Sequence, residues 1–268
     1  MEIRKQSGAS MFVWIGVLSA LSVILLPVPT WGKPNTWTEQ FAEQHDVKVS
    51  VTNRSTWFES ADGVVQCDPV DAEALERYVP ILQSELSLYS SRFLRSINFK
   101  QLTLCGALHA DGDPVRGVTV LNMGRVYLSA LATYSEVHLK TPIHHEIFHL
   151  MDWDHEGMWD DDPQWNRINR GGFRYASQSD ASSSQRKTQS RQTAALGFVT
   201  HYSKASPKED RAELFAELVV NYPAVVGQAE HDAVLRSKIN HLKRVVQRFG
   251  GGMGGPFWER VRKRQQAP

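Results

Sequence analysis

The stretch TPIHHEIFHLMD, residues 141–152, decides how this chain is expected to fold. Within it His145 and His149 are four positions apart, and residues four apart lie on the same face of a helix. Both imidazole rings can therefore direct a nitrogen at one ion, with Glu146 beside them. The stretch predicts a helix that carries a metal site on one of its faces.

The same stretch predicts where that helix begins. Thr141 is typical of an N-cap, and Pro142 fits the first helical position because a proline there sacrifices no hydrogen bond. The apolar residues around Phe148 form the side that we expect to be buried. His144 points to a different face, and we expect it to be exposed or to lie behind the metal ligands.

The spacing H-E-x-x-H in residues 145–149 indicates zinc chemistry. Zinc lowers the pKa of a bound water toward about 7. Glu146, one position from His145, could take a proton from that water and pass it to a leaving amine. We therefore predict a Zn²⁺ cofactor and Glu146 as the general base.

Two residues are candidates for the third zinc ligand. His155 has the metzincin spacing from His149, but Asp152 stands where that pattern has the glycine that allows a sharp turn. The other candidate is Glu209, at the start of a helix that Ser206 would cap. Glu209, Glu213 and Glu217 share one face of that helix, and its apolar residues indicate that it is packed rather than solvated.

At this point the chain resembles a known family. HEIFHLMD (145–152) followed by T-x-Y-x6-E-x3-E-x-F (200–215) is similar to the catalytic domain of anthrax lethal factor and to the bacterial zinc metallopeptidases like it, which are gluzincin-type zincins. The resemblance covers about residues 125–220. It implies that His145, His149 and Glu209 bind zinc and that Glu146 is the general base.

The resemblance also implies roles for three further residues. Tyr202 would donate a hydrogen bond to the oxyanion of the tetrahedral intermediate. Glu213 would orient a ligand histidine from behind, and Asp152 matches an acidic residue that follows the second histidine. Glu213 also remains an alternative third ligand, because ELFAE (213–217) fits a similar motif. His201 is expected to be exposed, and the substrate of lethal factor does not carry over.

The N-terminus indicates export. Arg4 and Lys5 precede the uncharged run 11–26, and helix-breaking residues follow it, so residues 1–32 read as a signal peptide or a signal anchor. The body would then be secreted, periplasmic or attached to the cell envelope, with membrane contact only through that anchor. In such a compartment the two cysteines, Cys67 and Cys105, can form a disulfide.

The rest of the chain predicts one zincin-like α+β domain, residues 33–268, with a helical C-terminal half. The formal net charge is only +1, which gives no reason to expect nucleic acid as a partner. We expect a peptide or protein substrate, and strand 125–130 is a candidate edge along which it could pair. The expected helices are 36–43, one running from 72 to about 94, 207–222 and 230–248, and the expected strands are 48–52, 102–106, 118–122 and 125–130.

Three segments are expected to lack regular structure: the irregular loop 159–172, the mobile loop 177–192 and a solvated basic tail, 260–264. Two other functions remain open. A fourth protein ligand, either Glu213 or His155, would close the site and indicate a zinc-binding envelope protein without catalysis. His155 as the third ligand would indicate a metzincin-like peptidase.

Overall fold

The structure is a computed structural model, and the residues it describes all belong to one compact unit, 34–268. The described residues are 36–60, 63–156, 162–169, 171–176 and 196–266. The predicted signal or anchor (1–32) and the whole of the predicted loop 177–192 therefore lie outside the described residues. Within the described part of the chain, no helix is both long enough and apolar enough to cross a bilayer.

Two four-stranded sheets form the β part of the unit. The first has the order β1-β4-β8-β7, in which β1, β4 and β8 are parallel and β7 runs antiparallel at one edge. The second has the order β2-β3-β5-β6 and is antiparallel throughout. The strands are β1 Lys48–Val51, β2 Thr56–Ser60, β3 Gly63–Cys67, β4 Gln101–Cys105, β5 Leu108–Ala110, β6 Asp113–Pro114, β7 Gly117–Val120 and β8 Arg125–Ser129.

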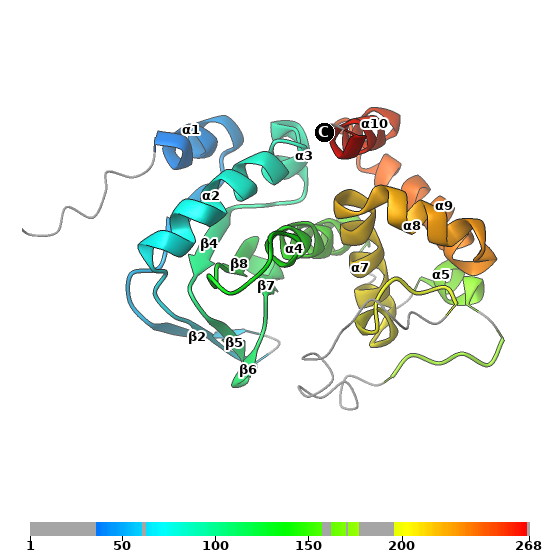
Figure 1. Ribbon diagram of the computed structural model, residues 1–268, viewed down its shortest axis with the longest axis horizontal. Helices are drawn as coiled ribbons and strands as arrows, with labels where there is room; N and C mark the ends of the chain where they lie inside the picture. Colours follow the sequence, from blue (N-terminus) through cyan, green and yellow to red (C-terminus); the bar gives the residue numbers. More distant parts are fainter. Residues whose placement is uncertain (1–35, 61–62, 157–161, 170, 177–195, 267–268) are drawn as a thin grey trace, which may run out of the picture. The chain divides into compact units, whose positions relative to one another are not determined.

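Three helices are interspersed with the strands, and from residue 136 onward the described regular elements are all helical, so the C-terminal half is helical as predicted (Figure 1). The helices are α1 Thr36–His45, α2 Ala72–Leu86, α3 Ser91–Ser96, α4 Glu136–Glu156, α5 Pro163–Ile168, α7 Pro207–Val220, α8 Tyr222–Glu230, α9 Ala233–Arg248 and α10 Gly255–Gln266, with short 3₁₀ turns η1 Leu121–Met123 and η3 Tyr202–Lys204. The four predicted strands of the first sheet are all present, whereas none of the strands of the second sheet was predicted.

Helix α4 is the centre of the unit. It packs against α7, against α2 and against strand β7, and Figure 1 shows it between the first sheet and α7. Phe148 of α4 meets Phe215 of α7 with ring centroids 5.2 Å apart, and both side chains are fully buried. Burying an aromatic side chain of this kind stabilises the fold by roughly 1.5–3 kcal/mol. The α4–α7 contact is thus part of the hydrophobic core.

Four local predictions are corrected. Helix α4 begins at Glu136 rather than at Thr141, whose hydroxyl instead donates to the carbonyl of Val137 at 3.0 Å, and Pro142 lies inside the helix. Ser135 is as good a local cap, since its hydroxyl accepts a hydrogen bond from the His138 N–H at 3.4 Å.

The helix predicted from 72 to 94 is two helices, α2 and α3, because Ser90 caps a new helix with its hydroxyl.

The other two corrections concern segments expected to be irregular. Within 159–172, residues Pro163–Ile168 form α5, which Asp162 caps. The basic segment 260–264 belongs to helix α10, although Arg260, Arg262 and Lys263 are exposed to solvent as expected. Phe257, Trp258 and Val261 bury the opposite face of α10, which anchors the helix.

A disulfide joins the two sheets. It links Cys67 of β3 to Cys105 of β4, which confirms the pairing that the sequence predicts. The bond closes a separation of 38 residues, and the loop-closure entropy it removes from the unfolded chain corresponds to roughly 4 kcal/mol.

The edge strand of the first sheet next to the predicted strand 125–130 is β7, and 125–130 itself is not an edge. Strand β8 (Arg125–Ser129) has β4 on one side and β7 on the other, so its backbone groups are paired. The turn η1 reverses the chain between the two strands, and Gly124 ends it in the left-handed region. The reversal places β7 outside β8 and next to α4.

Candidate metal centre

Two helices supply the side chains of the centre. His145 and His149 lie one turn apart on α4, and Glu209 is in the first turn of α7. Ser206 caps α7, because its hydroxyl accepts a hydrogen bond from the Glu209 N–H at 3.3 Å. The cap fixes the start of α7 and hence the place of Glu209 opposite the two histidines.

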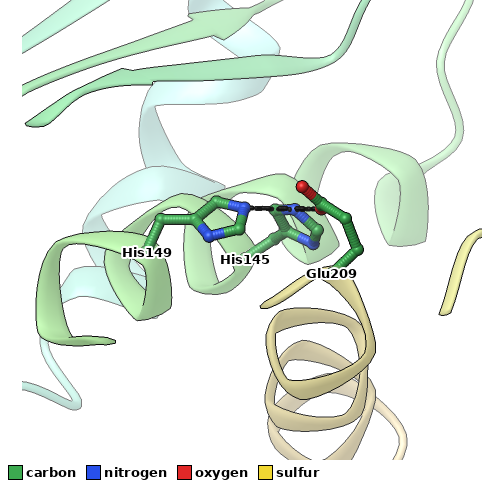
Figure 2. A group of neighbouring side chains, drawn as sticks. All are labelled: His145, His149 and Glu209. Atoms are coloured by element: carbon green, nitrogen blue, oxygen red, sulfur yellow. Dashed lines mark hydrogen bonds and ion pairs between the residues drawn. The ribbon is translucent and has the colours of Figure 1, made fainter. Parts of the chain in front are cut away.

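Three donor atoms from these residues converge (Figure 2). The Nε2 atoms of His145 and His149 are 3.0 Å apart, and Oε2 of Glu209 lies 3.1 Å and 3.5 Å from them. All three side chains are buried. They are the group of described residues whose donor atoms are placed to hold a metal ion.

The arrangement fits zinc. Zinc prefers four tetrahedral ligands at about 2.0–2.2 Å from nitrogen or oxygen, so neighbouring ligand atoms are about 3.3 Å apart. The three measured separations, 3.0, 3.1 and 3.5 Å, bracket that value. Moreover, the lone pairs of these three buried atoms, two imidazole nitrogens and one carboxylate oxygen, repel one another at this distance unless a proton or a cation lies among them. The donor set of two imidazoles and one carboxylate therefore suits a divalent ion.

The charges around the centre also favour a cation. Burial acts to raise the pKa of Glu209, but the charge of His149 and the hydrogen bond with His145 outweigh it and hold this pKa well below its usual value. Burial acts to lower the pKa of His145, but hydrogen bonds to Glu209 and Glu213 raise it well above the usual value. The lowered pKa keeps Glu209 negative, and the raised pKa shows that positive charge on His145 is favoured, so the site stabilises positive charge between the two helices.

Glu213 approaches His145 from the other side of the ring. Its Oε1 lies 2.9 Å from Nδ1 of His145, while its Oε2 accepts a hydrogen bond from the Thr200 hydroxyl at 2.7 Å. Glu213 thus contacts the ring nitrogen that faces away from the three converging atoms, where it can fix the tautomer that leaves Nε2 free to bind a metal. Thr200 is a contact that the sequence reasoning missed, although it begins the T-x-Y motif.

Glu146 lies against strand β7. Its Oε2 accepts a hydrogen bond from the Thr119 hydroxyl at 2.7 Å, and its side chain is buried. In the sequence, Thr119 is only one residue of the predicted strand 118–122, with no sign of a role at the site. Its position in β7 is a signal only once the strand is known to lie beside α4.

Tyr202 is close to the metal centre. It is half-buried in η3, just before α7, and its ring centroid is 6.2 Å from that of His145, with the planes inclined by 28°. The structure thus brings Tyr202, which the sequence singled out, beside the ring of His145. His201, next to it, is exposed, as predicted.

Asp152 joins the two helices. Its Oδ2 accepts hydrogen bonds from Nη2 of Arg211 at 2.7 Å and from Nε at 3.2 Å. Burial raises the pKa of Asp152, although Arg211 partly offsets this. The charge of His149 also acts on this carboxyl, so Asp152 lies near that ligand while it holds α7 against α4.

Helix α4 carries two further histidines, His144 and His155. His144 is fully buried rather than exposed, with Tyr89 and Glu85 on its ring nitrogens at 2.7 and 2.9 Å. His155 lies where α4 still continues, because the helix runs to Glu156 without turning after His149. Six residues of helix place the backbone of His155 roughly 9 Å further along the axis than that of His149. The side chain of His155 is outside the described residues.

Comparisons with known proteins agree with this centre. A family model described as "Putative zinc-binding metallo-peptidase" matches residues 74–249, which include all the residues discussed above. The chain is also similar to a crystal structure described as a putative zinc-binding metallo-peptidase from Bacteroides caccae ATCC 43185. The TM-score is 0.54, with 16% sequence identity over 84% of this chain and 88% of that one. No curated protein matches significantly.

At this level of identity the crystal structure supports the fold alone. The family model, in contrast, spans more than half of the chain and includes both helices of the centre. Its description as zinc-binding agrees with the His145, His149 and Glu209 group that could hold a metal. The chain belongs to this family of zinc-binding metallo-peptidases.

Proposed function

We propose that this protein is an exported zinc-dependent peptidase in which His145, His149 and Glu209 hold the ion and Glu146 is the general base. The observation that carries the proposal is the convergence of two imidazole nitrogens and one carboxylate oxygen within 3.0–3.5 Å of one another. Glu146 is the neighbour of one ligand in the chain and is buried with them.

The proposed chemistry is hydrolysis of a peptide bond by water. A zinc ion at this site would polarise the scissile carbonyl and favour ionisation of the attacking water. Glu146 accepts the proton of that water and passes it to the leaving amine. Tyr202 donates a hydrogen bond to the oxyanion that develops on the carbonyl oxygen. Glu213 holds the ring of His145, and Asp152 holds α7 through Arg211.

Strand β7 supports a mode of substrate binding. Ser129 donates its N–H to the carbonyl of Arg116 at 2.9 Å, and in an antiparallel pair alternate residues share such bonds. Gly117 and Thr119 therefore direct their backbone groups away from β8, at the edge of the sheet beside Glu146. We infer that an extended peptide pairs with this edge, which places its carbonyl groups near the metal centre.

The remaining features of the proposal come from the sequence. The motif that spans 200–215 supports a gluzincin-type site like that of the lethal factor catalytic domain, with Glu209 as third ligand and Glu213 behind His145. The signal-like residues 1–32 support export, and the Cys67–Cys105 disulfide is compatible with an oxidising compartment.

A zinc protein without catalysis is the alternative. It requires a fourth protein ligand, and within the described part of the chain the converging group has three members. Glu213, one of the two candidates for closure, faces Nδ1 of His145 instead of Nε2. An open fourth position is what a hydrolytic site needs, so this geometry favours the peptidase.

The substitution Glu146→Gln tests the proposal. The variant should retain stoichiometric zinc by elemental analysis, while hydrolysis of casein or of a quenched fluorescent peptide library falls by about 10²–10⁴-fold. Undiminished cleavage by the zinc-loaded variant would disprove the role of Glu146. If the wild-type protein holds zinc but cleaves no peptide in the library, the alternative without catalysis is favoured.

A further inference from the structure

We propose that Thr119 is a positioning residue for Glu146 and that Gly117 provides the space in which the Glu146 carboxylate lies. The inference rests on the proposed role of Glu146 as general base. It assigns to strand β7 a second task beside the pairing of substrate.

The contact between Thr119 and Glu146 is short and buried. The Thr119 hydroxyl oxygen lies 2.7 Å from Oε2 of Glu146 and 3.1 Å from the backbone carbonyl oxygen of the same residue. A hydroxyl has one proton to donate, and the shorter distance and the negative charge favour the carboxylate as its acceptor. Thr119 therefore holds one carboxylate oxygen, and both partners are shielded from solvent.

Gly117 lies against the same carboxylate. A Cβ at this position would come within 2.5 Å of Oε1 of Glu146 and 2.6 Å of its Cγ. The backbone of Gly117 is not in the left-handed region, so its conformation does not demand glycine. The space taken by Glu146 is the reason that a larger side chain does not fit.

The two residues act from one face of one strand. Side chains two positions apart in a strand point to the same face, so Gly117 and Thr119 both face α4. Oε2 is occupied by the hydroxyl, while Oε1 lies beside the bare Cα of Gly117. Oε1 is then the oxygen left to accept the proton of the attacking water. The strand thereby keeps the base in a fixed orientation before substrate arrives.

The first test removes the hydroxyl. Thr119→Val keeps the shape of the side chain but not the donor, and we expect kcat for a cleaved peptide to fall about 10–100-fold while KM and zinc content stay unchanged. Thr119→Ser, which keeps the hydroxyl, should restore kcat to within about threefold of the wild type, since the donated hydrogen bond is retained. Thr103→Val is the matched control: Thr103 lies in β4 of the same sheet and has the same exposed fraction, 7%, as Thr119.

The second test fills the space beside the carboxylate. Gly117→Ala should displace the Glu146 side chain and lower kcat, with the zinc ligands still in place. Gly227→Ala is its control, because an added Cβ there meets nothing within 4 Å. A crystal structure of each zinc-loaded variant gives a readout that does not depend on activity: Glu146 should leave its wild-type orientation in Thr119→Val and in Gly117→Ala.

The outcomes separate this inference from the proposed function. Full kcat in Thr119→Val, or loss of kcat in Thr119→Ser equal to that in Thr119→Val, would overturn the positioning role while the peptidase stands. If the wild-type protein cleaves no peptide, the proposed function fails, and the crystal structures still test the contact. A Glu146 carboxylate that keeps its orientation in both Thr119→Val and Gly117→Ala would overturn the inference on structural grounds alone.

Discussion

Two neighbouring histidines of α4 belong to two different buried clusters. His145 belongs to the metal centre, whereas His144 belongs to what we name the Glu85 cluster, which consists of Glu85, Tyr89, Lys140, His144 and Arg264. Both histidines are buried, and both lie beside a buried glutamate. Residue types and burial alone therefore do not distinguish a metal site from a structural network.

The partners of the ring nitrogens make the difference. In the Glu85 cluster, Nε2 of His144 lies 2.9 Å from Glu85, and the Tyr89 hydroxyl lies 2.7 Å from Nδ1. Burial outweighs the raising effect of Glu85 and lowers the pKa of His144, which agrees with a neutral ring that donates from one nitrogen and accepts on the other. Arg264 and Lys140 offset the charge of Glu85. This cluster supplies its own cations.

The metal centre does not supply its own cation in this way. Its two Nε2 atoms and one carboxylate oxygen converge to within 3.0–3.5 Å of one another. A buried carboxylate with histidine thus indicates a metal only where acceptor atoms converge, and a structural role where each acceptor already has a donor. Substitutions of matched residues in the two regions test this distinction.

The largest expected difference is between Glu209→Gln and Glu85→Gln in zinc binding. Glu209→Gln removes one of the three proposed protein ligands, and we expect the zinc dissociation constant to rise on the order of 10³-fold. Glu85→Gln should leave it unchanged, because Glu85 contacts the other histidine. Competition with a chromophoric chelator measures both. Equal weakening of zinc binding by the two substitutions would contradict the separation of the clusters.

The second prediction concerns the free energy of unfolding, for which Glu85→Gln should have the larger effect and Glu209→Gln the smaller. Glu85→Gln leaves Arg264 and Lys140 without their buried anion, which should cost about 3 kcal/mol in the free energy of unfolding at pH 7. Urea denaturation in the presence of a chelator measures this cost without a contribution from zinc. Glu209→Gln should cost less under the same conditions, because no arginine or lysine depends on Glu209 in the described contacts.

The cost of Glu85→Gln should also depend on pH. Burial acts to raise the pKa of Glu85, but His144 and Arg264 outweigh it, so the folded pKa lies below the usual 4.5. The unfolded chain therefore takes up this proton first as the pH falls. The contribution of Glu85 is complete above about pH 4.5 and is lost as the pH drops through the folded pKa. A cost that is equal at pH 7 and at pH 4 would show that the charge of Glu85 is not its source.

A smaller effect is expected from the residue behind the metal ligand. Glu213→Gln keeps a hydrogen-bonding side chain but removes the charge next to Nδ1 of His145, so zinc affinity should fall about 10–100-fold. Thr200→Val, which removes the donor to Glu213, provides a milder version of the same change. A loss of affinity in Glu213→Gln as large as that in Glu209→Gln would instead support Glu213 as the third ligand.

The smallest effect is expected at Tyr89. Tyr89→Phe removes one hydrogen bond to His144 and should lower the free energy of unfolding by about 1 kcal/mol, with zinc affinity unchanged. Tyr202→Phe is the counterpart at the metal centre: it should leave stability nearly unchanged but lower kcat. Thermal unfolding and a peptidase assay of both variants measure this contrast. A change in zinc affinity in Tyr89→Phe would mean that the two clusters are coupled through α4.

Much of the fold was predictable because its signals are local. The strands at 48–52, 102–106, 118–122 and 125–130 are formed, as are the helices that carry His145 and Glu209. The predicted start of α4 was wrong because Ser135 is as good a cap as Thr141 and Pro142 lies inside the helix. The helical conformation of 260–264 was not predicted because the buried face of α10 packs against segments far away in the chain, such as Phe215 against Phe257.

By itself, the sequence determined that two histidines share a helical face with a glutamate between them, because a periodicity of 3.6 residues is a property of the backbone. It also determined that a second packed helix carries Glu209 and Glu213, and that the two cysteines can pair. The tertiary structure decided which acidic side chain meets which ring nitrogen. It also placed β7, and not β8, at the edge beside Glu146, since the order of strands follows from contacts between segments distant in the chain. Thr119 and Gly117 are visible as partners of Glu146 only after that choice.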